Sequence, residues 1–147
     1  MDIHSSGHIF LTGHTLSGTA NWDTYTMKID LNGVLIWEAK TGNPRGYDPN
    51  FIHDEAWGVA ATPDGGCITV AGTGDEYAGY SSCQNGNCSD QWEVYLIKYS
   101  ANGQLEWQNT YNPNGGDMAG EDIIYTTNNK IVVAVDDGSF GFLSLMP

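Results

Sequence analysis

Basic residues are few in this sequence, and their scarcity excludes two classes of partner. Five lysine and arginine residues stand against 18 aspartate and glutamate residues, so the formal net charge is −13 and the pI is near 4.2. A chain with this charge repels the phosphate backbone of nucleic acids and anionic membrane surfaces. We therefore expect neither nucleic acid nor a membrane as a partner. The acidity is typical of a soluble protein, and binding of calcium or a cationic ligand is the alternative use for it.

Long apolar segments are also missing. No run is long enough for a transmembrane helix, and no window keeps an apolar stripe at helical spacing. The first residues lack the order of a signal peptide, so the protein is either made without one or begins after it. The 147 residues include 19 glycines and 12% aromatic residues, a composition that favours short strands joined by tight turns. This length suffices for one domain with a buried core.

Enzyme and metal signatures are absent as well. The sequence has no G-x-S-x-G, no H-E-x-x-H, no phosphate-binding glycine loop and no contiguous calcium loop. The four histidines do not have the spacing of metal ligands. We therefore expect no cofactor, with Ca²⁺ as the alternative, because acidic loops offer the oxygen ligands that it prefers.

Cysteine occurs only three times. Cys83 and Cys88 flank Asn85-Gly86, a pair that forms tight turns and can bring the two cysteines within bonding range. The sequence favours a disulfide here over two free thiols, whereas a zinc site would need further ligands nearby. Cys67 lies in the strand-like segment CITVAG and is expected to be a buried, small apolar residue.

The sequence does contain a clear internal repeat. The segment WDTYTMKIDLNGVLIW (Trp22 to Trp37) recurs without a gap as WEVYLIKYSANGQLEW (Trp92 to Trp107). Other frames also recur, each with the alternation of a strand next to a turn. One frame is SSGHIFLTG (residues 5–13), which recurs as DGGCITVAG (64–72) and more loosely as NNKIVVAV (128–135), so that His8 aligns with Cys67. Another is DEAWGVAAT (54–62), which recurs as DMAGEDIIY (117–125) and aligns Asp54 with Asp117. The segment VYLIKYSA also recurs as the final FGFLSLMP.

Four antiparallel strands per repeat are typical of a β-propeller blade, because one four-stranded sheet cannot bury both faces until neighbours stack on it. The middle unit has all four strands, the first has the last three and a stub at Met1–His4, and the last has the first three. We therefore predict an all-β, propeller-like array of about 2.5–3 blades in a single domain spanning residues 1–147. The blades are residues 1–47, 48–113 and 114–147.

So few blades cannot close a ring, which needs about four to eight. The outer faces would expose apolar positions such as Ile9, Leu11, Ile131 and Val133. Either copies associate, with a homodimer favoured, or the chain is a piece of a longer propeller.

Within the repeated hairpin, each residue type has a structural role. Asn32-Gly33 and Asn102-Gly103 supply the positive φ angles of a tight turn. Trp37 and Trp107 are expected to pack between blades. Lys28 and Lys98 stand between apolar neighbours, so their stems should pack while the ammonium groups reach the sheet edge or a carboxylate.

The chain resembles the β-propeller repeat of bacterial and archaeal secreted and surface proteins. The resemblance covers nearly the whole chain and implies the propeller fold and a secreted or cell-surface location, without an activity. The third copy departs from the pattern, since it lacks the Gly-Gly pair and the lysine. The matching residues are Asp23, Tyr25, Lys28, Asp30, Asn32, Gly33, Trp37, Asp54, Ala56, Thr62, Asp64, Gly65, Gly66, Ile68, Ala71 and Gly72.

Function is expected at one end of the sheets, which we call the long-loop end. There the connections 41–53, 73–91 and 112–116 are long or irregular, whereas the opposite end has only tight turns. We predict a non-catalytic module that binds a carbohydrate or a protein partner, and the alternative is a hydrolase or lyase with an acid–base pair at the propeller axis. The candidate ligand-binding residues are His53, Asp54, Asp75, Glu76, Tyr77, Tyr80, Trp92 and Asp117.

The disulfide predicts a specific thiol count. The unfolded, unreduced protein should show one reactive thiol, from Cys67, and reduction should raise the count to the full three cysteines. Thiol titration with mass measurement before and after reduction checks this. Two or three reactive thiols in the native protein, with no mass change on reduction, would rule the disulfide out.

Overall fold

The computed structural model describes residues 1–75, 91–113 and 115–146. These residues form strands β1 to β11 and no helix, which confirms the all-β prediction. The strands form three antiparallel sheets of 4, 4 and 3 strands, none of them closed, and each lies within one of the predicted units. The first sheet contains β1 (Asp2–His4), β2 (His8–Thr15), β3 (Asp23–Asp30) and β4 (Leu35–Thr41). The middle sheet contains β5 (Ile52–Ala61), β6 (Cys67–Asp75), β7 (Glu93–Tyr99) and β8 (Leu105–Tyr111), and the third contains β9 (Ala119–Tyr125), β10 (Ile131–Asp136) and β11 (Phe140–Leu145).

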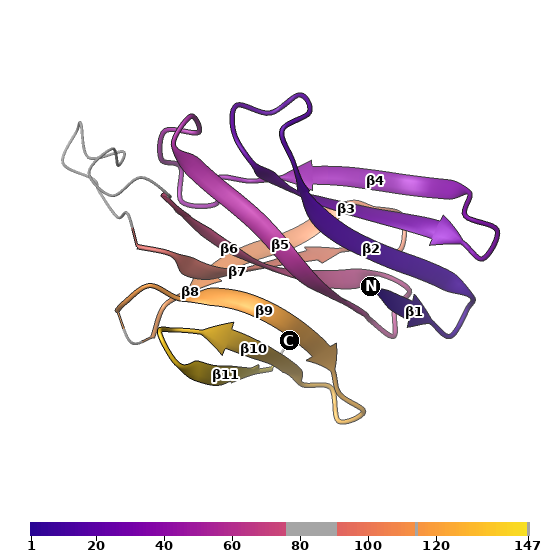
Figure 1. Ribbon diagram of the computed structural model, residues 1–147. Helices are drawn as coiled ribbons and strands as arrows, with labels where there is room; N and C mark the ends of the chain where they lie inside the picture. The colour runs from indigo at the N-terminus through magenta and orange to yellow at the C-terminus, as the bar shows by residue number, and fades with distance from the viewer. Residues whose placement is uncertain (76–90, 114, 147) are drawn as a thin grey trace.

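The middle sheet lies between the other two, with β5 in contact with both β2 and β9 (Figure 1). One apolar cluster joins the first and middle sheets through residues such as Phe10, Tyr95 and Ile97. A second joins the middle and third sheets through residues such as Leu96 and Val133. Side chains on the two faces of β6 belong to different clusters, so every residue of this strand is buried.

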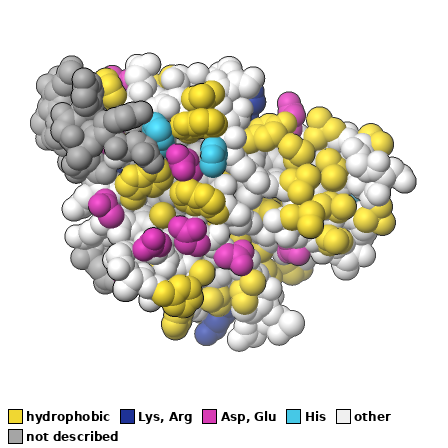
Figure 2. All heavy atoms as spheres, viewed as in Figure 1, with side chains coloured by type: hydrophobic (Ala, Val, Ile, Leu, Met, Phe, Trp, Pro, Cys, Tyr) yellow, Lys and Arg dark blue, Asp and Glu magenta, His cyan; other side chains and the backbone are white. Residues whose placement is uncertain are grey.

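The first and third sheets each keep one face in contact with solvent. Ile9 and Leu11 lie half-buried on the outer face of the first sheet, where hydrophobic side chains gather on the surface (Figure 2). The prediction that Ile131 and Val133 are also outward was wrong, because both are buried against the middle sheet. Strand alternation then turns Val132 outward.

The tight turns have equivalent geometry in all three sheets. Gly7, Gly65 and Asn129 occupy the same place after the first strand, with φ angles of 81°, 83° and 59°. In each turn this residue donates its N–H to the carbonyl three positions earlier. Gly33 and Gly103 do the same after the third strand, with φ angles of 81° and 79°. The predicted positive φ is thus confirmed for the two glycines, but Asn32 and Asn102, which precede them, do not have it.

These turns also correct two of the predicted repeat alignments by one residue each. Phe10 pairs with Lys28 as Ile68 pairs with Lys98, so Ile9, and not His8, is the equivalent of Cys67. Thr62 N–H bonds Gly66 O as Thr126 N–H bonds Lys130 O, so Asp54 is equivalent to Met118 and not to Asp117. Side chains alternate between faces along a strand, so this single step decides which of them meet the neighbouring sheet.

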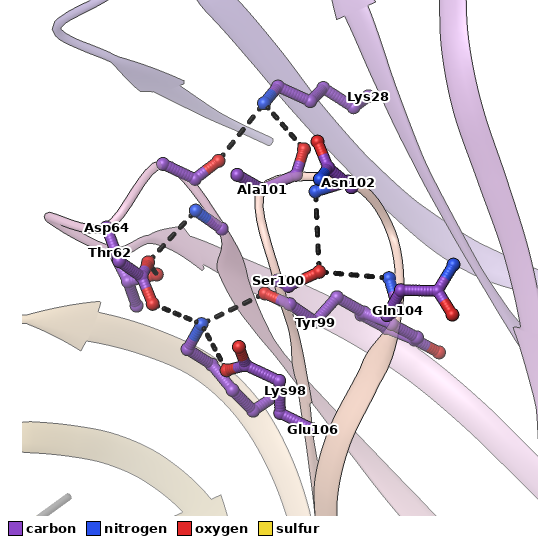
Figure 3. Close-up of polar contacts among 12 residues, drawn as sticks. Lys28, Thr62, Asp64, Lys98, Tyr99, Ser100, Ala101, Asn102, Gln104 and Glu106 are labelled. Carbon is purple, nitrogen blue, oxygen red and sulfur yellow. Dashed lines mark hydrogen bonds and ion pairs between the residues drawn. The ribbon is translucent and has the colours of Figure 1, made fainter.

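The two lysines fix the turns of the middle sheet (Figure 3). Lys98 Nζ lies 2.8 Å from Asp64 Oδ2 and 3.0 Å from Glu106 Oε2. Lys28 Nζ donates to the carbonyls of Gly65 and Ala101, each at 3.1 Å. Partial burial raises the pKa of Asp64, but the hydrogen bonds from Lys98, Thr62 and Gly66 outweigh it and bring the pKa to about 2. The expected role of the lysines at the sheet edge is therefore confirmed.

Both tryptophans of the repeated hairpin pack between sheets, as predicted. The ring of Trp37 lies against Phe10 and Tyr99, and its Nε1 donates to Ala101 O of the middle sheet at 3.1 Å. Trp107 is partly buried against the cluster between the middle and third sheets.

Two glycine substitutions distinguish the stability that comes from the Trp37 contact from the cost of backbone strain. Gly33→Ala should cost about 1–2 kcal/mol because its φ is positive, and nothing lies within 4 Å of the added carbon. Gly103→Ala has the same strain, but its carbon would lie 2.7 Å from the Trp37 ring, so it should cost about 1–3 kcal/mol more. Urea unfolding measures both, and equal losses would contradict the contact between Trp37 and the turn.

Candidate functional site

The long-loop end brings together the described residues of the predicted site. Strand pairing places Asp54 opposite Thr73, and Ile52 opposite Asp75. Trp92 N–H donates to Asp117 Oδ1 at 3.0 Å, which joins the start of the third sheet to the same end. The predicted residues Glu76, Tyr77 and Tyr80, and the cysteines Cys83 and Cys88, lie outside the described residues.

Asp54 is the most perturbed carboxyl of this end. Its side chain is 1% exposed, and its Oδ2 accepts the N–H of Asn43 at 2.7 Å. Burial raises the pKa of this carboxyl, Thr73 and Asn43 lower it, and the neighbouring charges of Asp23 and Arg45 act in opposite directions. The resulting pKa is about 6. The Thr73 hydroxyl is near enough to lower the pKa of Asp54. Thr73 Oγ1 and Asp54 Oδ1 are nevertheless both buried without a hydrogen bond of ordinary geometry. Asp54 is thus protonated far more readily than a surface carboxyl.

Asp23 and Asp54 converge on Gly42, in the loop between the first and middle sheets. A carbon added to Gly42 would overlap Asp23 Oδ1 and lie 2.7 Å from Asp54 Oδ2, so a larger residue would displace these carboxyls. Partial burial also raises the pKa of Asp23, with Lys40 acting against it. The two carboxyls come from different sheets, and sequence patterns gave no sign that they meet.

Arg45 ties the same loop to the middle sheet. Its guanidinium donates to Gln91 O at 3.0 Å and Thr73 O at 3.1 Å, and it lies 3.4 Å from Glu93 Oε1. It also covers the ring of Tyr47 at 4.9 Å. Arg45 was not predicted as a functional residue from the sequence, although its being the single arginine of the chain is a usable signal.

His53 and Asp75 are placed at the same end but inside the protein. His53 Nδ1 lies 3.3 Å from Glu55 Oε1, and both His53 and Asp75 are buried. Their burial leaves little of either side chain for a ligand to contact.

Trp92 and Asp117 are the predicted residues that line open space. The Trp92 ring lies across Gly72 and Gly74 of β6, where an added carbon would come within 2.7 Å and 2.5 Å of it. Trp92 O accepts the N–H of Met118 at 2.9 Å, so the backbone of Trp92 is hydrogen-bonded on both sides, to Asp117 Oδ1 and to Met118. A cavity of about 250 Å³ lies beside it, and its lining residues are Trp92, Asp117, Met118, Ala119, Asp136 and Gly138. Asp117 and Asp136 are both exposed.

Within the described ranges, no group of three or more His, Cys, Asp or Glu side chains is arranged to hold a metal ion. The same part of the chain contains no helix long and apolar enough to cross a membrane. Cys67, the cysteine in the described residues, is free and buried, and burial raises the pKa of its thiol to about 12.

No known family model matches this chain, and no curated protein is similar to it. Among solved structures, a protein of unknown function from Bacteroides caccae, determined at 1.35 Å resolution, is similar with 13% sequence identity and a TM-score of 0.35. The match covers 97% of this chain and 54% of that protein, so the chain spans about half of its length.

The raised pKa of Asp54 predicts a pH-dependent effect of Asp54→Asn. Between about pH 4 and 6, the unfolded state loses this proton while the folded state keeps it, so the free energy of unfolding falls as the pH rises. Above pH 6 the full cost of the buried charge is present, at most about 3 kcal/mol. Asparagine removes the charge and keeps an acceptor for Asn43, so the variant should gain stability at pH 7.5 and little at pH 4.

Urea unfolding of both proteins at the two pH values measures this effect. Asp30→Asn is a control of opposite sign, because the N–H groups of Val34 and Asn32 lower the pKa of Asp30. Its ionised form is favoured by folding, so this variant should lose stability at pH 7.5. An Asp54→Asn gain as large at pH 4 as at pH 7.5 would contradict the assignment.

Proposed function

We propose that the chain is a non-catalytic module of β-propeller type that binds a carbohydrate ligand at its long-loop end. The three sheets correspond to blades in this proposal. Their meander order, their face-to-face stacking and the equivalent turns of successive sheets support it.

The observation that carries the binding proposal is the cavity beside Trp92. Its indole offers a flat apolar surface, and Gly72 and Gly74 let that ring rest directly on the buried strand β6. Asp117 and Asp136 add carboxylate oxygens, which accept hydrogen bonds from hydroxyl groups. A rigid aromatic surface beside two acceptors suits a sugar ring, which has both apolar C–H faces and hydroxyl donors.

The hydrolase or lyase alternative receives less support from the same residues. Asp54 has a pKa near the value useful to a general acid, but its carboxyl is buried and bonded to the loop backbone. It is also not among the residues that line the Trp92 cavity. Asp54 therefore suits a structural role between the first two sheets.

The binding proposal is tested on a glycan array, followed by calorimetry with a glycan that binds. The double variant Asp117→Asn, Asp136→Asn keeps acceptors for Trp92 N–H and Gly138 N–H but removes both charges from the cavity. It should weaken binding about tenfold or more, since hydrogen bonds to charged groups contribute about 1.5–3 kcal/mol each. Asp30→Asn, at the tight-turn end, also replaces a carboxylate that caps backbone N–H groups and should leave the affinity unchanged.

Three results would overturn the proposal. The first is that no glycan binds, and the second is that the double variant and the Asp30→Asn control weaken binding equally. The third is turnover of the bound glycan, which would favour the hydrolase or lyase instead.

A further inference from the structure

The outer face of the third sheet exposes positions that are fully buried in the middle sheet. Ala134 pairs with Phe142 as Val70 pairs with Leu96, so Phe142 is the equivalent of Leu96. Leu96 is 0% exposed because the third sheet covers it, whereas Phe142 is 70% exposed. Phe140, one step along the same face, is 85% exposed. Large exposed aromatic residues at such positions indicate a surface that takes a neighbour.

The outer face of the first sheet shows the complementary pattern. Leu11 pairs with Met27 as Thr69 pairs with Ile97, so Met27 is the equivalent of Ile97. Ile97 is fully buried between the first and middle sheets, whereas Met27 is half-buried. Ile3, opposite Ile9 on the same face, is 57% exposed. Figure 2 shows hydrophobic side chains gathered over this sheet.

Sheets stack in one direction throughout the chain. We call the face that carries Lys28, Lys98 and, in the third sheet, Ser144 the leading face, and the opposite one the trailing face. The leading face of the first sheet packs on the trailing face of the middle sheet. The leading face of the middle sheet packs on the trailing face of the third. The two uncovered faces are therefore one of each kind.

We propose that a second copy of this chain docks head to tail, with the leading face of the third sheet against the trailing face of the first sheet of its partner. The contact continues the stacking of the two interfaces within the chain, and both complementary faces belong to the same molecule. Two copies then make a ring of six sheets, within the four to eight blades of propellers. A head-to-tail contact that closes into a ring leaves no apolar sheet face uncovered. The proposal goes beyond the binding function, since it uses other surfaces than the Trp92 cavity.

The experiment is sedimentation velocity at micromolar concentration on the full chain and on variants that place a charge on each face. Wild-type protein should sediment at twice the mass of 15.9 kDa. Phe142→Asp on the leading face and Ile3→Asp on the trailing face should each give the single-chain mass, and both sites are exposed enough for the fold to tolerate aspartate. Leu105→Asp is the control, because Leu105 is an exposed residue of the enclosed middle sheet, and it should leave the dimer intact.

Mixing the two monomeric variants tests the direction of docking. The Phe142→Asp chain keeps its trailing face and the Ile3→Asp chain keeps its leading face, so the mixture should recover a species of two chains. Dissociation by Phe142→Asp with no effect of Ile3→Asp would indicate a symmetric contact of two leading faces and overturn the proposal. A folded wild-type monomer at micromolar concentration would overturn it too, and would point to further sheets of a longer protein or to another partner as the cover.

Discussion

The fold depends on enclosing the middle sheet between two others. Each residue of β6 and nearly all of β7 are buried, and their side chains alternate between two separate apolar clusters. A four-stranded sheet that is apolar on both faces cannot be stable in water until both are covered. The first and third sheets provide that cover. Folding of the central strands is therefore coupled to the docking of strands that lie far away in the sequence.

The two ends of the sheets have different tasks. At the tight-turn end, Lys28 of the first sheet binds carbonyls in two turns of the middle sheet and so fixes how these sheets meet. Lys98 binds Asp64 and Glu106 within the middle sheet. At the long-loop end, Asp54 and Arg45 fasten the connecting loop to the middle sheet. These contacts hold the sheets in place around the cavity beside Trp92. Its lining residues come from the third sheet and its connections, and from Trp92 itself, just before β7 of the middle sheet.

The strands and turns could be predicted from the sequence because their signals are local. The Asn-Gly pairs and the alternation around Lys28 and Lys98 determine hairpins within about twenty residues. The exact alignment of the repeats was harder to predict. Either His8 or Ile9 could be the equivalent of Cys67 until the hydrogen bonds of the turns are known. Ile131 and Val133 were expected on the outside for a different reason. Ile131 occupies the position of Ile9, but this face is uncovered in the first sheet and covered by the middle sheet in the third. The meeting of Asp23 with Asp54 depends on loop 42–51, which has no regular pattern, and so no spacing rule could find it.

Hydrogen exchange measured along the wild-type chain tests the enclosed middle sheet most directly. Amides exchange slowly where both hydrogen bonding and burial persist, so the slowest should lie in Cys67–Thr73 of β6 and Val94–Tyr99 of β7. Amides of β4 and β11, at the outer edges of their sheets, should exchange much sooner. Rapid exchange in β6 and β7, together with slow exchange in the first or third sheet, would contradict the account.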